Sequence, residues 1–277
     1  FRFYESERKD EPIMIQFHIF PGGVKRIVTF SYDDGNRRDA WLVDLFNRYK
    51  VKGTFHLNAA NYLEKTEDEL SAIRRLYAGH EIACHTVHHG WLNKMPPATR
   101  VREVLEDRMV LEKLSGTPVV GMSYPSGAYD KETEACLAAC GIVYSRTTNN
   151  GGFSIPEDFL AWHPTAHHSE AAPLIDDFMA NLTSQWRDPL FYIWGHSHEF
   201  QTDADYAAME DIVRRLSGSN QIWYATNFEI YSYVKALRSL IVSADETMLY
   251  NPSAIDVWVE KDKSEIIKIP AGTTVTL

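Results

Sequence analysis

The sequence predicts an α/β protein in which parallel strands alternate with helices and curl into a barrel. Apolar runs rich in β-branched residues alternate with amphipathic stretches from Lys25 to about Leu240. About seven of these runs qualify as strands, and their alternation with helices favours a barrel over a sandwich or a helical bundle. Aspartate and histidine residues follow several of the runs, as expected where the carboxyl ends of parallel strands gather a functional site.

The predicted strands are short apolar runs bounded by polar or glycine-containing turns. They cover residues 26–32, 53–57, 81–84, 119–124, 142–144, 190–194 and 222–224. The predicted helices carry apolar residues at intervals of three and four, as at Leu42, Leu45, Phe46 and Tyr49. They cover about residues 42–49, 70–77, 101–116, 130–140, 206–216 and 228–240. Residues 146–168 show no clear period and are predicted to be irregular.

The pattern changes after residue 240. Ile255, Val257 and Val259 alternate along the chain, and residues 266–277 contain two short extended runs around Pro270-Ala271-Gly272. This pattern predicts a few antiparallel strands packed on the barrel. The expected organisation is an N-terminal extension over residues 1–24, a barrel over residues 25–240 and a β appendage over residues 241–277.

Composition restricts the partners and the compartment. The chain has 277 residues, of which 44% are hydrophobic, and its formal net charge of -10 argues against a nucleic acid or an anionic membrane as partner. The longest apolar stretch, near residues 135–144, is far shorter than the roughly 20 residues that a membrane span needs. No secretory signal pattern opens the sequence, and an odd number of cysteines argues against a disulfide scaffold, so we expect a reducing, cytoplasmic setting. Met14 is an alternative start, and whether residues 1–13 are native is left open.

Two short segments carry most of the predicted chemistry. Ser31-Tyr32-Asp33-Asp34-Gly35 follows the β-branched run 26–30, and His85-Thr86-Val87-His88-His89 follows the run 81–84. One carboxylate with two neutral imidazoles is a common ligand set for a catalytic divalent metal with an open position. The second aspartate can then act as a base. The two segments together predict a metal-assisted hydrolase.

The density of histidines in the second segment favours a functional role over a purely structural one. His85 and His89 are four residues apart, so both imidazoles can reach one metal if the turn between them is helical. His80 and His88 belong to the same stretch, and for these two a structural role stays open. Strand alternation points Cys84 away from His85, so we expect this cysteine to be buried and inert.

Four segments resemble the motifs of polysaccharide deacetylases of the NodB-homology type, carbohydrate esterase family 4. Residues 31–35 resemble the motif Thr-Phe-Asp-Asp-Gly, and residues 85–89 match the motif His-[Ser/Thr]-x-x-His. Ser123-Tyr124-Pro125-Ser126-Gly127 resembles the third motif, Arg-x-Pro-[Tyr/Phe]-Gly. Trp194-Gly195-His196 lies where the family's Leu-x-His motif is expected. The resemblance covers roughly residues 25–240, with the motifs in the family's order.

The resemblance implies a distorted (β/α)7 barrel that binds one divalent metal, usually zinc, with a short N-terminal extension and a small C-terminal β appendage added in this chain. In the family the metal lowers the pKa of its bound water toward about 7 and polarises the scissile carbonyl. The resemblance implies that Asp33 is the base, that the backbone N–H of Ser126 holds the oxyanion and that His196 protonates the leaving amine. The metal ligands that it implies are Asp34, His85 and His89.

Several positions depart from the family's pattern. Ser123 stands where the family has an arginine that orients the catalytic aspartate, and Ser126 stands where it has an aromatic residue. The fourth motif, which supplies an aspartate that tunes the acid histidine, has no convincing match, and Ala161-Trp162-His163-Pro164 is the candidate replacement. Trp162 is then either a sugar-stacking or pocket-wall residue, or a core residue. His198 competes with His196 for the role of acid, because strand alternation puts both on one face, and the motif favours His196.

Other aromatic residues are candidates for a sugar-binding groove. Trp91, Trp194 and Tyr129 could each line such a groove and are equally consistent with packing. His198 is counted with them as a further substrate-binding candidate.

The sequence therefore predicts a metal-dependent hydrolase that removes acetyl groups from N-acetylated, or alternatively O-acetylated, saccharides. One alternative is a C–N hydrolase of a small non-sugar amide, because related family members cleave ureide rings on the same scaffold. The missing arginine and the absence of a secretion signal favour this alternative slightly. The other alternative is a catalytically silent carbohydrate-binding barrel, which would be expected to lose the base or a metal ligand. The sequence indicates neither the substrate, the metal used in the cell nor the oligomeric state.

Overall fold

The structure, a computed structural model, describes residues 14–277 and divides into two compact units. One unit comprises residues 25–232, and the described part of the other contains residues 14–24 and 233–277. The first thirteen residues of the predicted N-terminal extension lie outside the described residues. No helix within residues 14–277 is long and apolar enough to cross a membrane.

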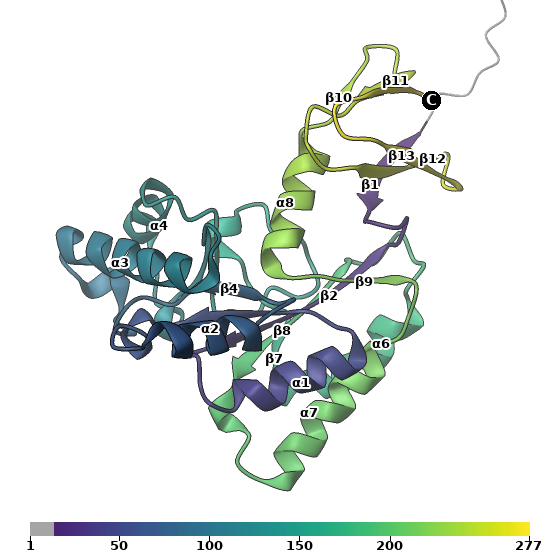
Figure 1. Cartoon of the computed structure of the whole chain (residues 1–277). Helices are drawn as coiled ribbons and strands as arrows, with labels where there is room; N and C mark the ends of the chain where they lie inside the picture. Colours follow the sequence, from purple (N-terminus) through teal and green to yellow (C-terminus); the bar gives the residue numbers. More distant parts are fainter. Residues whose placement is uncertain (1–13) are drawn as a thin grey trace, which may run out of the picture. The chain divides into compact units, whose positions relative to one another are not determined.

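The larger unit is built on a curled parallel sheet, which confirms the predicted α/β barrel class (Figure 1). The longest strand, β2 (Arg26–Asp33), lies near the centre of this sheet and is buried along its whole length. It pairs with β3 (Gly53–Leu57) on one side and β8 (Leu190–His196) on the other. The strands in sheet order are β6 (Tyr144–Arg146), β5 (Gly121–Ser123), β4 (Glu81–Cys84), β3 (Gly53–Leu57), β2 (Arg26–Asp33), β8 (Leu190–His196) and β7 (Ala166–His167). A further short strand, β9 (Ile222–Tyr224), pairs with the beginning of β2.

Helices cover the sheet, and their ends follow from local sequence. Thr66 and Glu69 form a capping box at the start of α2 (Glu67–Leu76), and Thr202 and Asp205 form another at the start of α7 (Asp203–Leu216). Gly116, with φ of 77°, ends the longest helix in the left-handed conformation. The helices are α1 (Asp39–Tyr49), α2 (Glu67–Leu76), α3 (Pro97–Ser115), α4 (Lys131–Ala139), α5 (His168–Ala171), α6 (Ile175–Ala180), α7 (Asp203–Leu216) and α8 (Asn227–Arg238). The sequence predicted all of them except α5 and α6.

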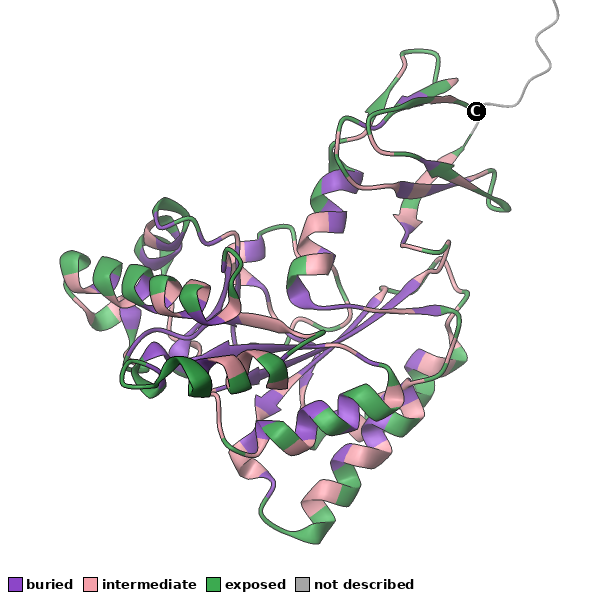
Figure 2. Ribbon diagram, viewed as in Figure 1, coloured by how far each residue is buried: buried purple, intermediate pink, exposed green. Residues whose placement is uncertain are grey.

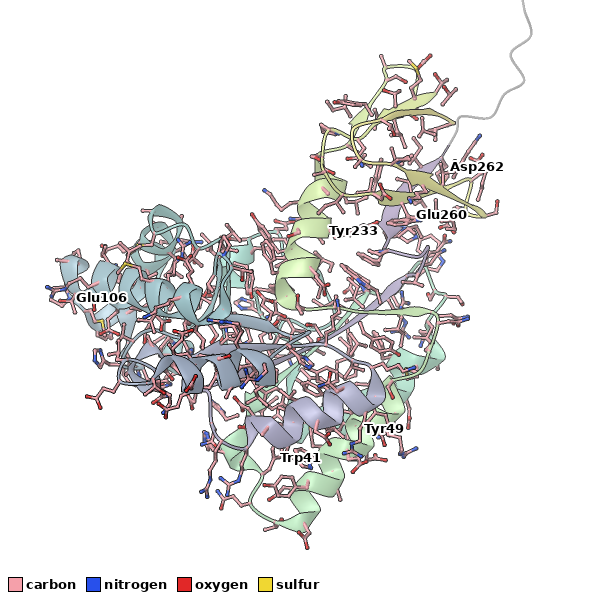
Figure 3. The ribbon with its side chains drawn as sticks, in the orientation of Figure 1. Trp41, Tyr49, Glu106, Tyr233, Glu260 and Asp262 are labelled. Atoms are coloured by element: carbon pink, nitrogen blue, oxygen red, sulfur yellow. The ribbon has the colours of Figure 1, made fainter. Side chains whose placement is uncertain are left out.

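The core lies between the sheet and these helices, and Figure 2 shows the central strands buried while the helices expose their outer faces. Phe30 of β2 packs on Phe46 of α1, with ring centroids 4.8 Å apart. Trp41 of α1 meets Tyr206 of α7 edge to face at 4.6 Å, and the labelled Tyr49 at the other end of α1 donates a hydrogen bond to Glu210 (Figure 3). These contacts hold α1 and α7 side by side on one face of the sheet.

The segment between β6 and β8, predicted to be irregular, joins the two edges of the sheet. Trp162 donates its backbone N–H to the Ser145 carbonyl at 3.0 Å and accepts from Thr147 at 2.9 Å. Four residues later β7 begins, and it pairs with β8. Trp162 itself is completely buried and packs edge to face on Tyr192. A sugar-stacking role for Trp162 is therefore wrong, because a fully buried indole cannot reach a substrate.

The smaller unit consists of antiparallel strands, as the alternating tail of the sequence predicts. Tyr233 donates its hydroxyl to the Ile19 carbonyl at 2.7 Å and accepts from the Trp258 N–H at 3.0 Å (Figure 3). The smaller unit contains two three-stranded sheets. In one, the strand order is β1 (Ile15–Ile19), β12 (Val257–Lys261) and β13 (Glu265–Ile269). In the other, it is β10 (Ile241–Val242), β11 (Met248–Tyr250) and β14 (Thr274–Thr276). The strand β1 was not predicted.

Candidate active site at the carboxyl ends of the strands

The carboxyl ends of neighbouring parallel strands bring the predicted polar residues together. Asp33 is the last residue of β2, and its register partner on β8 is His196. His85 follows β4 directly, Ser123 ends β5 and Arg146 ends β6. Because these strands are adjacent in one parallel sheet, residues far apart in the sequence converge at one rim.

Asp34, His85 and His89 form a cluster that suits a divalent cation. Asp34 Oδ1 lies 3.5 Å from His85 Nε2 and 3.6 Å from His89 Nε2, and the three candidate ligand atoms lie within 4.8 Å of one another. His85 Nδ1 donates to the Ser123 carbonyl at 2.9 Å, so the Nε2 lone pair is free to bind a metal. Asp34 Oδ1 and His85 Nε2 are both buried without a hydrogen-bond partner among the described residues. Two orphaned acceptor atoms that face each other fit a metal-binding site.

The backbone around this cluster is held in a sparsely populated conformation. Asp34, Thr86, His89 and Ser126 all have positive φ, at 77°, 64°, 56° and 55°. Side chains other than glycine rarely adopt the left-handed region, and such residues concentrate at functional sites. Four of them at one rim mark this rim as the functional end of the sheet.

Buried polar side chains fix the loop that carries His85. Asp107 of α3 accepts the backbone N–H of His85 at 2.9 Å and that of Ala59 at 2.8 Å. Asn58 donates its amide to the carbonyl oxygens of His85 and Thr86 at 2.7 and 3.0 Å. Burial raises the pKa of Asp107 to about 7, although its hydrogen bonds act in the opposite direction. These contacts fix the backbone from which the His85 side chain projects.

Asp33 is buried and held by two partners. Arg146 forms an ion pair with Asp33 Oδ2, and the Ser123 hydroxyl donates to Oδ1 at 3.0 Å. Burial is the largest single influence on the pKa of Asp33 and raises it, but the positive charge of Arg146 and the neighbouring histidines together outweigh burial, and the pKa lies well below its usual range. The guanidinium also stacks on the ring of Trp194, 4.5 Å from its centroid. Asp33 is therefore a fixed, ionised carboxylate.

His196 and His198 lie near different carboxylates at the end of β8. His196 Nδ1 is 3.4 Å from Glu199 Oε1, whereas His198 Nδ1 is 3.7 Å from Asp34 Oδ2. Burial is the largest single influence on the pKa of His196 and lowers it, but the nearby carboxylates of Glu199, Asp33 and Asp34 together raise it more, so the net shift is upward. The two rings are 5.0 Å apart, so both histidines line the site.

Glu199 also contacts a second pair of histidines. His167 Nε2 and His168 Nε2 lie 3.0 and 3.5 Å from Glu199 Oε2, and the three residues could be read as a second metal site. However, His167 Nδ1 accepts the N–H of Ser169 as a helix cap, so Nε2 carries the proton and donates to Glu199. This tautomer makes the group a hydrogen-bond network around one carboxylate.

The remaining predicted residues occupy varied positions. Ser126 is exposed in a tight turn, and Tyr129 is partly buried and stacks on Tyr124 at 5.0 Å. Trp194 is partly buried and lines a pocket of about 200 Å³. Cys84 is buried, and burial raises the pKa of its thiol well above the usual value, as expected for an inert cysteine. His88 pairs with Glu103 at 2.7 Å, outside the cluster formed by Asp34, His85 and His89.

Sequence reasoning missed two charged residues of the site. Arg146, on the strand next to Ser123, supplies the guanidinium that the family places at the position of Ser123. Glu199 supplies a carboxylate beside His196, the role that the family gives to the aspartate of its fourth motif. Glu199 lies three residues after His196, a spacing that the sequence displays. Arg146 was hidden because the predicted strand ended at residue 144, whereas β6 spans Tyr144–Arg146.

The fold and this rim define an α/β barrel protein with a candidate metal centre at the carboxyl ends of its strands. Residues 22–145 match the family model described as polysaccharide deacetylase. A Bacillus subtilis (strain 168) protein named "Putative polysaccharide deacetylase YxkH" is 26% identical over 145 residues, which is 50% of this chain and 50% of that protein. The chain thus spans about half the length of this curated relative. The match over residues 22–145 confirms the resemblance read from the motifs.

Solved structures of similar fold support the same architecture. The crystal structure of Puue allantoinase superposes with a TM-score of 0.61 at 16% identity, covering 80% of this chain and 93% of that chain. A structure described as "putative polysaccharide deacetylase from Mycobacterium smegmatis" gives a TM-score of 0.57 at 17% identity, covering 79% and 93%. Because these identities are low, the likeness establishes the fold alone.

Proposed function

We propose that this protein is a metal-dependent hydrolase that removes acetyl groups from N-acetylated saccharides. The observation that carries the proposal is the pairing of two sets of groups at one rim. Asp34, His85 and His89 offer two orphaned ligand atoms, and an ionised Asp33 lies 3.8 Å from the His85 ring. The family match of residues 22–145 supports deacetylation as the reaction.

Asp34, His85 and His89 would hold the metal, for which zinc is the best candidate because a carboxylate with two imidazoles is a usual zinc ligand set. When bound there, the metal supplies a Lewis acid that polarises the scissile carbonyl and makes water a better nucleophile. Asp33 takes the proton from the attacking water. Arg146 and Ser123 keep its carboxylate ionised and oriented for that transfer.

The remaining steps use groups on β5 and β8. The backbone N–H of Ser126 donates to the carbonyl oxygen as negative charge develops on it. His196, whose pKa is raised by Glu199 and Asp33, gives its proton to the leaving amine, and acetate is the second product. The pocket of about 200 Å³ beside Trp194 supplies space for part of the substrate.

The first test measures metal content and acetate release together. We expect close to one equivalent of zinc or another divalent metal in the purified protein, and acetate release from N-acetylated sugars that stops on chelation and returns with metal. Metal without acetate release, but with hydrolysis of a small cyclic amide, would replace this proposal with the C–N hydrolase alternative. Absence of both metal and turnover would leave only a carbohydrate-binding barrel.

The choice of acid is tested by separate substitutions of two neighbouring histidines. His196→Ala should lower kcat by about 10²-fold, since a positioned general acid contributes at least this factor. His198→Ala should change kcat by less than about tenfold, because His198 Nδ1 pairs with Asp34 Oδ2 at 3.7 Å, whereas His196 Nδ1 pairs with Glu199. Glu199→Gln should lower the pKa of the basic limb of the kcat profile by removing the carboxylate beside His196. A larger loss at His198 would transfer the acid role to that residue.

A further inference from the structure

Trp91 is an exposed aromatic residue at the rim of the site. Its side chain follows the candidate metal ligand His89 by two residues and is 54% exposed. Its indole N–H donates to the Ser126 hydroxyl at 3.1 Å. Trp91 thus reaches from the loop after β4 to the turn after β5, and contacts the residue whose backbone N–H is the proposed oxyanion donor.

The loop that carries Trp91 is anchored directly after this residue. Leu92, the next residue, is completely buried, and the buried Arg100 donates to the Leu92 carbonyl at 2.9 Å and to that of Met95. The indole N–H is fixed by Ser126, so the ring has little freedom left to lose when a ligand binds. A rigid, exposed aromatic ring provides contact area at low entropic cost.

We propose that Trp91 is a substrate-binding residue that stacks on the pyranose ring carrying the acetamido group. This inference rests on the proposed function and names the substrate class more closely. The C–H groups on one face of a pyranose form an apolar surface that complements an aromatic face, whereas a small acyclic amide or ester has no such surface. Because Trp91 is tied to Ser126, a sugar stacked on the indole lies beside the group that receives its acetyl carbonyl.

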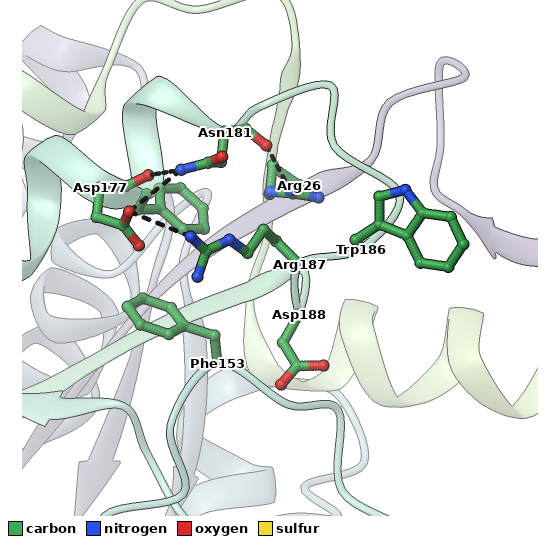
Figure 4. Close-up of a pocket in the computed structure, with 8 residues that line it drawn as sticks. Arg26, Phe153, Asp177, Asn181, Trp186, Arg187 and Asp188 are labelled. Carbon is green, nitrogen blue, oxygen red and sulfur yellow. Dashed lines mark hydrogen bonds and ion pairs between the residues drawn. The ribbon is translucent and has the colours of Figure 1, made fainter.

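The test compares Trp91 with a second exposed tryptophan of the same unit. Trp186 is 81% exposed and lies beside a pocket of about 250 Å³ lined by Arg26 and Asp188, at the amino ends of β2 and β8 (Figure 4). Trp91→Ala should raise KM for N,N′-diacetylchitobiose at least about tenfold with kcat changed less than about twofold, the pattern of lost uniform binding. Trp186→Ala should leave both constants unchanged.

Two further measurements separate this inference from the proposed function. Trp91→Phe should restore much of the binding, since it keeps an aromatic face and loses only the N–H. Calorimetric binding of the same disaccharide to Asp33→Asn protein, with and without Trp91→Ala, reports on stacking without turnover. Weaker binding on loss of Trp91 supports the inference even if acetate release fails. Unchanged KM and unchanged affinity on loss of Trp91 would overturn it even if the enzyme is an active deacetylase.

Discussion

Replacing Asp33 with Asn should abolish most turnover while leaving the metal in place. We expect kcat to fall by about 10²–10⁴-fold, because an amide cannot accept the proton that the carboxylate takes. The carbonyl oxygen of the introduced amide can still accept from Arg146, and Asp34, His85 and His89 are untouched. Acetate release and metal content measured on the same preparation check both halves of the prediction.

A matched substitution on the other side of the site gives the contrast. His85→Ala or His89→Ala should lower metal content and turnover together, because each removes one of three ligands. If either histidine variant retains both the metal and full activity, the assignment of these residues as metal ligands is wrong. Turnover close to wild type in Asp33→Asn would show that another group is the base.

The strands that carry the motifs could be predicted because the local sequence of each strand is sufficient to identify it. The β-branched run before Asp33 and the apolar run before His85 are bounded by turn residues, and β3, β4 and β9 begin and end where the sequence placed them. The parallel sheet then follows from alternation with helices, and it brings Asp34 and His85 together whatever lies between them. The roles assigned to these residues stay predictions until they are measured.

The remaining features depend on tertiary contacts that no local pattern carries. Residues 142–143 are as apolar as a strand, but β6 begins at Tyr144, so the end of this strand and the position of Arg146 were missed. Trp162 lies in an irregular stretch and is buried because its backbone pairs with β6. The strand β1 pairs with β12 from the opposite end of the chain, and the local sequence of neither strand indicates that the two strands pair.

Replacing Arg146 with Gln should destabilise the fold and shift the pH dependence of catalysis. Arg146 and Asp33 are both buried, and removing one partner of a buried ion pair costs about 3–5 kcal/mol. Without Arg146, burial raises the pKa of Asp33 above its unfolded value of about 3.9, so ionised Asp33 opposes folding at neutral pH. The loss of unfolding free energy should therefore be largest near pH 7 and shrink as the pH falls toward 4. Urea unfolding at several pH values measures it.

The same substitution should move the acid limb of the kcat/KM profile to higher pH, because the base must lose its proton before it can act. Arg26→Gln is the matched control, since Arg26 is equally buried but donates to the carbonyl oxygens of Asn181 and Ser184. It should lower stability without moving the acid limb, as β2 separates Arg26 from Asp33 by its full length. An acid limb unchanged in Arg146→Gln would mean that Arg146 does not hold Asp33 ionised, and that Ser123 and the site's other positive groups suffice.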